Sequence, residues 1–130
     1  MNERMDSDPQ LSQIGPIAIT VSDIGAALAF YRDVLGLTFL FDAGTDLAFL
    51  DAGGVRLMLT KPEGAGAVGC NSTLYFKATD VVAVHAALVA RGATDGGSPH
   101  LIARMPDHEL WIGFLRDPDG NLIGLMEEKR

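Results

Sequence analysis

Cysteine is nearly absent from this sequence, since Cys70 is the only one among 130 residues. A single cysteine excludes an intrachain disulfide framework and a cysteine-rich zinc knuckle. Long apolar runs are missing too, because no stretch approaches the ~18 residues of a membrane-spanning helix. The first thirteen residues are polar and lack the apolar core of a signal peptide. We therefore expect a cytoplasmic protein with a flexible segment at residues 1–13.

Basic residues are also scarce: ten lysines and arginines stand against seventeen acidic residues, which gives a formal net charge of −7. Nucleic-acid binding requires a basic stripe, so this balance argues against a nucleic-acid partner. It argues equally against binding to an anionic membrane surface. What remains is an ordinary globular composition, 48% hydrophobic and 21% charged, in a chain whose length suits one domain.

The hydrophobic pattern predicts the same series of elements twice: a strand, a helix and three strands. A capping residue precedes each predicted helix and a glycine follows it, which is typical of helix ends. The predicted elements of the first series are a strand at 14–21, a helix at 24–35 and strands at 37–41, 47–50 and 55–60. Those of the second are a strand at 73–78, a helix at 81–90 and strands at 101–105, 110–115 and 122–126.

Two short motifs show that this series is an internal repeat. Residues 17–23 (IAITVSD) match residues 74–80 (LYFKATD), and residues 51–54 (DAGG) match residues 117–120 (DPDG). The second copy carries about nine extra residues, which we place between 98 and 110. The sequence therefore predicts an α+β fold of two tandem βαβββ modules. Module 1 is expected at 14–60, a linker at 61–71 and module 2 at 72–127.

The repeat, together with FYRDVLG at 30–36 and DPDGN at 117–121, resembles the vicinal oxygen chelate superfamily. This is the glyoxalase/bleomycin-resistance/extradiol-dioxygenase group, and the resemblance covers residues 14–127. It implies that each module is a curled mixed sheet with one helix on its convex face. It also implies that the concave faces form a ligand cup, commonly completed by a homodimer.

The metal enzymes of this superfamily, such as lactoylglutathione lyases and methylmalonyl-CoA epimerases, carry a histidine or glutamate on the first and last strand of each module. Alignment on the motifs puts no such residue at these positions here. Proline and glycine have no ligating side chain, methionine suits soft metals, and neutral threonine is a poor ligand. We therefore expect no metal and no other cofactor. The four positions are Pro16, Met58, Thr73 and Gly124.

Strand side chains alternate between faces, which predicts the residues that line the cup. Residues two positions away from the four family positions, such as Arg56 and Tyr75, should face the cup with them. The residues between them along each strand are apolar and should pack against the helices. Pairing the last hairpin through DPDG puts Gly113 opposite Gly124 and Trp111 opposite Met126. Pairing the preceding hairpin through residues 106–107 puts Arg104 opposite Glu109 and His100 opposite Gly113. The predicted ligand-binding residues are Phe49, Arg56, Met58, Tyr75, His100, Arg104, Trp111 and Met126.

Three functions fit these patterns. The leading hypothesis is metal-independent binding of a small, partly apolar molecule in the cup, as in the sequestering bleomycin-resistance branch. The second is an isomerase, epimerase or lyase in which His100 or Glu109 is the general base and Arg104 holds an anionic substrate. The third is a metal-dependent lyase or dioxygenase with non-standard ligands.

Overall fold

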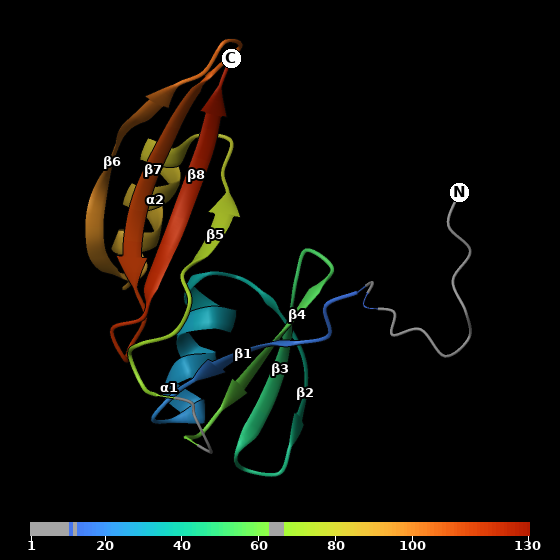
Figure 1. Cartoon of the computed structure of the whole chain (residues 1–130). Coiled ribbons are helices and arrows are strands. Elements are labelled where there is room, and N and C mark those ends of the chain that lie inside the picture. The colour runs from blue at the N-terminus through green and yellow to red at the C-terminus, as the bar shows by residue number, and fades with distance from the viewer. Residues whose placement is uncertain (1–10, 12, 63–66) are drawn as a thin grey trace, which may run out of the picture.

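The computed structural model describes Leu11, residues 13–62 and residues 67–130. The flexible segment expected at residues 1–13 lies almost entirely outside the described residues, and so do residues 63–66 of the expected linker. Each half of the chain forms one four-stranded sheet with its own helix (Figure 1). The α+β fold of two βαβββ modules, predicted from the repeat, is confirmed.

The element bounds follow the sequence pattern closely, and helix α2 and strand β4 coincide with the predicted ranges. Module 1 contains β1 (Ile17–Thr20), α1 (Ile24–Leu28), the π-helical segment η1 (Ala29–Val34), β2 (Thr38–Ala43), β3 (Leu47–Ala52) and β4 (Val55–Thr60). Module 2 contains β5 (Leu74–Lys77), α2 (Val81–Ala90), β6 (Thr94–Arg104), β7 (Glu109–Arg116) and β8 (Leu122–Lys129). None of the helices in the described part of the chain is long and apolar enough to cross a membrane.

The helices begin where the sequence supplies a capping carboxylate. Asp23 Oδ1 accepts a hydrogen bond from the Ala26 amide at 2.9 Å, and Asp80 Oδ1 accepts one from Ala83 at 3.1 Å. These bonds satisfy amides in the first turn that have no partner within the helix. The segment after α1 ends at Gly36, whose φ of 83° is readily adopted only by glycine.

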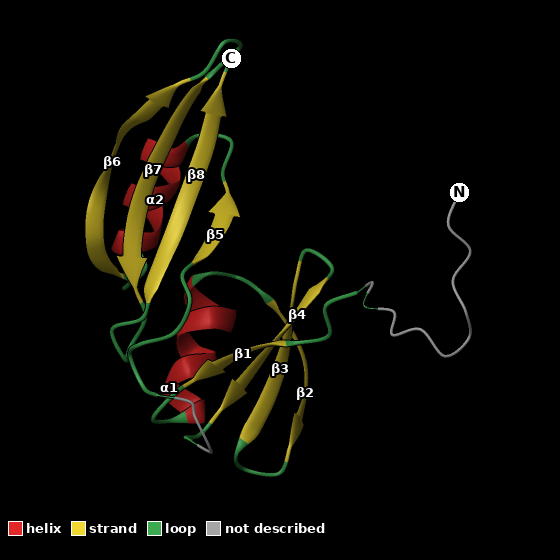
Figure 2. Cartoon of the chain, viewed as in Figure 1, coloured by secondary structure: helices red, strands yellow, loops and turns green. Residues whose placement is uncertain are grey.

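The strand order is β1-β4-β3-β2 in the N-terminal sheet and β5-β8-β7-β6 in the C-terminal sheet. In each sheet the first pair is parallel and the other two are antiparallel. One helix lies on one face of each sheet (Figure 2). Buried side chains such as Leu57 and Leu59 of the N-terminal sheet, and Leu115 and Ile123 of the C-terminal sheet, belong to one core that also includes helix residues. The prediction that these alternate apolar side chains pack against the helices is confirmed.

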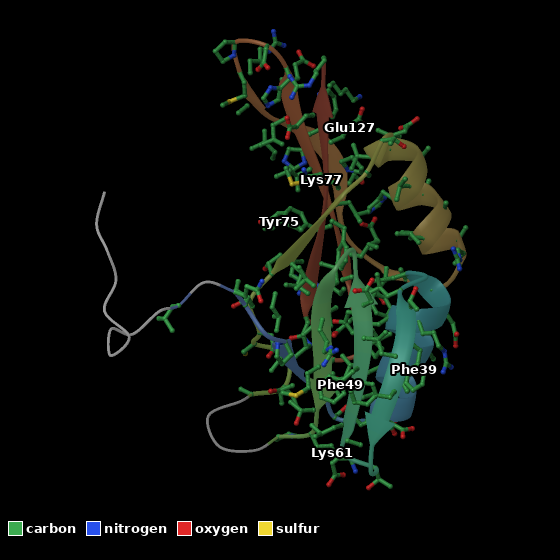
Figure 3. All side chains as sticks on the ribbon, turned by 90° about the vertical axis from the view of Figure 1, so that its right-hand side faces the viewer. Phe39, Phe49, Lys61, Tyr75, Lys77 and Glu127 are labelled. Atoms are coloured by element: carbon green, nitrogen blue, oxygen red, sulfur yellow. The ribbon has the colours of Figure 1, made fainter. Side chains whose placement is uncertain are left out.

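We call the opposite face of each sheet its free face, because no described helix or strand covers it. The two free faces point in different directions. In Figure 1 the C-terminal sheet lies in front of α2, whereas α1 lies to the left of the N-terminal sheet. In Figure 3, turned by 90°, Tyr75 and Lys77 lie on the side of the C-terminal sheet away from α2, and the N-terminal sheet lies in front of α1. A single chain therefore presents two separate open faces instead of one closed cup.

The register of β7 against β8 differs by one residue from the prediction. Arg116 pairs with Leu122, so Phe114 and not Gly113 lies opposite Gly124. The cause is the turn, because the Asp117 carboxylate accepts the amide of Asn121 at 2.8 Å and the Asp117 amide donates to the Asn121 carbonyl at 2.9 Å. These bonds close a loop over residues 117–121 and leave Arg116 in the strand. A one-residue slip exchanges the two faces of a strand.

Strand β6 begins seven residues before the predicted start at 101, and its register against β7 shifts three times, the last shift lying between Leu101 and Ala103. The predicted pairing of Arg104 with Glu109 is confirmed. Beyond the last shift, His100 pairs with Ile112 and not with Gly113. The predicted row of His100, Gly113 and Gly124 across the cup is therefore wrong.

Candidate functional site

The free face of the N-terminal sheet carries an apolar row that crosses all four strands. The cross-strand partners in this row are Ala18, Met58, Phe49 and Phe41. The rings of Phe41 and Phe49 stack with centroids 4.7 Å apart and planes inclined by 27°. Phe41 is 43% exposed although it is a large hydrophobic residue. We call the Phe41–Phe49 pair the aromatic platform.

Arg56 lies beside this platform. Its guanidinium carbon is 5.6 Å from the ring centroid of Phe41 and 5.9 Å from that of Phe49. Both distances fall within the range of a cation–π interaction. The cross-strand partner of Arg56 is Asp51, whose carboxylate instead accepts the Gly54 amide at 3.1 Å. The guanidinium is thus held by aromatic faces and not by a carboxylate.

The free face of the C-terminal sheet carries a second row, formed by Lys77, Met126, Ile112 and His100. His100 is exposed, and its Nδ1 lies 3.0 Å from the Ser98 carbonyl oxygen. The Tyr75 ring is 50% exposed and meets the Phe114 ring edge to face at 6.0 Å. A hollow of about 480 Å³ adjoins Lys77 and Met126 at the end of β5. This face is more polar than that of the N-terminal sheet.

The sequence-predicted site residues therefore fall into three groups. Phe49, Arg56 and Met58 come together on the free face of the N-terminal sheet, as expected from their parity. Tyr75, His100 and Met126 share the free face of the C-terminal sheet. The third group, on the helix-covered face of the C-terminal sheet, comprises Arg104, Glu109 and Trp111.

The placement of Trp111 in the cup is a wrong prediction, and the one-residue register shift is the reason. Trp111 pairs with Glu127 instead of Met126 and packs against the core. Its Nε1 donates to Glu109 Oε1 at 3.1 Å, and the Lys129 ammonium lies 4.1 Å from its ring centroid. Trp111 therefore packs against the core, and its indole N–H has a hydrogen-bond acceptor in Glu109.

The structure also separates the residues of the expected general acid–base set. Arg104 Nε lies 3.8 Å from Glu109 Oε2, but both residues lie on the face opposite His100. Their side chains are 75% and 40% exposed, so the pair is a solvated cross-strand ion pair. The three side chains do not converge on one point in this chain.

Phe41 is the site residue that the sequence analysis missed. The predicted strand at 37–41 includes it, and the unbroken register from Ala43 opposite Leu47 places it opposite Phe49, before the register shift between Phe41 and Phe39. Pairing the β2–β3 hairpin with Ala43 opposite Leu47 predicts the Phe41–Phe49 pair. The signal that finds Phe41 is therefore the register of this hairpin, which the alternation of side chains within a single strand does not supply.

The metal positions of the resembling enzymes do not fit a metal ion here. Met58 belongs to the apolar row, and Pro16 and Thr73 lie just before β1 and β5. At Gly124 the Tyr75 ring fills the space that a side chain would take, since an added Cβ would lie 2.6 Å from Tyr75 Cε1. Within residues 11, 13–62 and 67–130, no three histidine, cysteine or acidic side chains are grouped as metal ligands would be.

A family model described as the Glyoxalase/Bleomycin resistance protein/Dioxygenase superfamily matches residues 13–125. This match spans both modules and the connection between them. Among curated proteins, no relative matches the chain.

Solved structures with the same architecture include proteins of different described activities. A lactoylglutathione lyase from Agrobacterium tumefaciens is 28% identical, with a TM-score of 0.71 over 92% of this chain and 96% of that one. TnmS3, an antibiotic binding protein from Streptomyces sp. CB03234, is 26% identical, with a TM-score of 0.71 over 94% and 100%. A member of the same superfamily from Sphaerobacter thermophilus is 26% identical, with a TM-score of 0.73 over 91% and 98%.

Proposed function

The chain belongs to the glyoxalase/bleomycin resistance protein/dioxygenase superfamily, and from that premise we propose that it binds a small, partly apolar molecule without metal-dependent chemistry. The observation that carries the proposal is the uncovered row of Ala18, Met58, Phe49 and Phe41. Soluble proteins rarely leave such an aromatic strip open without a function. The similarity to an antibiotic binding protein supports a binding role.

The donor chemistry of the four family positions supports the metal-independent part of the proposal. In the metal enzymes these positions supply the ligands, and here they supply a proline, a methionine, a threonine and a glycine. The Tyr75 ring over Gly124 makes one of the four positions apolar and aromatic. We accordingly favour sequestration of the ligand over its conversion.

A second copy of the chain would complete the site. The two free faces of one chain point in different directions, so neither encloses a ligand by itself. In the homodimer that we propose, the free face of one copy's N-terminal sheet lies opposite the free face of the partner's C-terminal sheet. Sedimentation analysis at micromolar concentration should give twice the mass of 13.8 kDa, and a monomer would contradict this arrangement. The single cysteine agrees with our placement of the protein in the reducing cytoplasm.

Binding of a neutral apolar probe tests the function directly. Phenylnaphthylamine, whose fluorescence rises in apolar surroundings, should bind saturably to the wild-type protein. Phe49→Ala should weaken this binding about tenfold, because it removes half of the aromatic platform. Phe39→Ala is the matched control: this phenylalanine lies on the neighbouring strand β2 and is 36% exposed, but it pairs with Leu50 and not with the platform. Equal binding to all three proteins would contradict the proposal.

Elemental analysis tests the absence of metal chemistry. The protein is purified without chelator and its bound metals are measured. We expect well under one equivalent of any transition metal per chain. Near-stoichiometric zinc, nickel, manganese or iron would contradict the proposal and place the protein among the lyases or dioxygenases with non-standard ligands.

A further inference from the structure

Arg56 differs from the other arginines in the described part of the chain, because its guanidinium bonds to no protein oxygen there. The others each pair with a carboxylate or donate to a backbone carbonyl. They are Arg32, Arg91, Arg104, Arg116 and Arg130. Arg56 is exposed and rests on two aromatic rings, with its hydrogen-bond donors left for solvent or for a ligand.

The overall charge of the protein makes this arrangement informative. A chain with a formal net charge of −7 repels anions in general, so an anion would bind only where a local cation is available. Arg56 supplies such a cation at the edge of an apolar aromatic surface. Its fork of parallel N–H donors matches a carboxylate, sulfonate or phosphate group better than a lysine would.

We propose that the ligand of the N-terminal sheet is a planar aromatic acid, whose ring stacks on the Phe41–Phe49 platform and whose acid oxygens accept hydrogen bonds from Arg56. This inference rests on the proposed binding function and specifies the chemistry of its ligand. The 5.6 Å and 5.9 Å separations put the guanidinium within reach of a substituent on a ring that lies on either phenylalanine. Met58, next in the row, extends the apolar surface beyond the two rings.

The alternatives on the same surface are weaker matches. A neutral hydrocarbon would leave the Arg56 donors covered and unsatisfied, which costs free energy. A cationic ligand would be repelled by Arg56 itself. The carboxylate of Asp51, the cross-strand partner of Arg56, lies at the β3–β4 turn, where its Oδ1 accepts the Gly54 amide, and it forms no ion pair with Arg56.

Two probes with the same ring system separate this inference from the proposed function. Anilinonaphthalene sulfonate carries an anionic group, and phenylnaphthylamine is its neutral counterpart. The wild-type protein should bind the sulfonate about tenfold more tightly than the neutral probe, consistent with hydrogen bonds to a charged group. Arg56→Gln should abolish that preference, and the neutral probe should still bind it saturably. The sulfonate's advantage should also shrink as salt is added.

Arg32→Gln is the matched control, since it removes the same charge from an arginine in η1, on the helix side of the sheet, that is paired with Asp33. It should leave both affinities unchanged. If both probes bind equally well to wild type and Arg56→Gln, the aromatic-acid inference is wrong while the binding function stands. If neither probe binds saturably, the binding function itself is wrong. If Arg32→Gln weakens the sulfonate as much as Arg56→Gln does, the effect is one of net charge and the inference is again wrong.

Discussion

The hydroxyl of Tyr31 donates a 2.8 Å hydrogen bond to Asp117 Oδ2, and this bond joins η1 of module 1 to the β7–β8 turn of module 2. Both residues are buried, Tyr31 completely. Asp117 also accepts the Asn121 amide and side chain, so the bond belongs to a polar cluster at the junction. Buried polar groups of this kind are costly when a partner is removed.

Tyr31→Phe should therefore lower the free energy of unfolding by about 1–3 kcal/mol, because it leaves one Asp117 oxygen with a single remaining donor. Urea denaturation followed by circular dichroism measures the change. Tyr75→Phe is the control, since Tyr75 is the only other tyrosine and its hydroxyl makes no hydrogen bond within the described residues. We expect its effect to stay within about 0.5 kcal/mol. Equal losses in the two variants would contradict a role for the Tyr31–Asp117 bond.

The same pair should make stability fall at alkaline pH. Burial, and secondly the Asp117 carboxylate, raise the pKa of Tyr31 far above its ordinary value of 10.0. Above about pH 10 the unfolded chain releases the Tyr31 proton while the folded chain retains it. The folded state then binds more protons, so the free energy of unfolding decreases by up to about 1.4 kcal/mol per pH unit from this group. Its stabilising contribution is fully present below pH 10.

Unfolding free energies measured between about pH 8 and pH 11 test this dependence. The wild-type curve should fall more steeply above pH 10 than that of Tyr31→Phe, which lacks the titrating group. Parallel curves over the whole interval would show that Tyr31 does not titrate differently in the two states.

A close approach between β6 and β7 requires glycine at position 113. A Cβ added there would lie 2.8 Å from Pro99 Cγ and 3.2 Å from Pro99 Cα, and a backbone atom cannot move aside cheaply. Gly113→Ala should therefore lower the free energy of unfolding by about 1–3 kcal/mol. Pro99→Ala in the same chain should recover part of the loss, since it removes the closest atom.

Gly124→Ala is the comparison for this prediction. Its Cβ would meet the ring of Tyr75, but that ring is half exposed and can rotate into solvent. The Gly124 substitution should thus cost less than the Gly113 substitution in the same denaturation assay. The reverse order would contradict the assignment of Pro99 as the obstacle.

The repeat made the architecture predictable, because each local signal agrees with the fold. The capping carboxylates Asp23 and Asp80, the terminating glycines and the turn motifs all lie at matching places in the two modules. The one departure within a helix is the π-helical stretch at Ala29–Val34, which continues the predicted helix with a wider turn. Hydrophobic spacing alone does not distinguish these two helical forms.

The site was predictable where strands are regular and not where they are interrupted. Strand β4 has no register shift, so parity correctly grouped Arg56 and Met58 with Phe49 of β3. Strand β6 has three register shifts, so the predicted partner of His100 is wrong although His100 lies on the predicted face. The turn after β7 is one residue shorter than predicted, so the predicted face of Trp111 is wrong. Bulges and turn closure depend on backbone hydrogen bonds, such as those of Asp117, that leave no periodic signal in the sequence.

Trp111 provides a test that distinguishes the observed register from the one predicted. In the observed register its ring packs on the core under Lys129, away from both free faces. Trp111→Phe should lower the free energy of unfolding by about 1 kcal/mol, because the smaller ring leaves a gap and Glu109 loses its donor. The affinity for phenylnaphthylamine should stay within about twofold of wild type, since the platform residues are untouched. A folded Trp111→Phe protein that no longer binds the probe would instead place the indole in the cup, where a register shifted by one residue would put it.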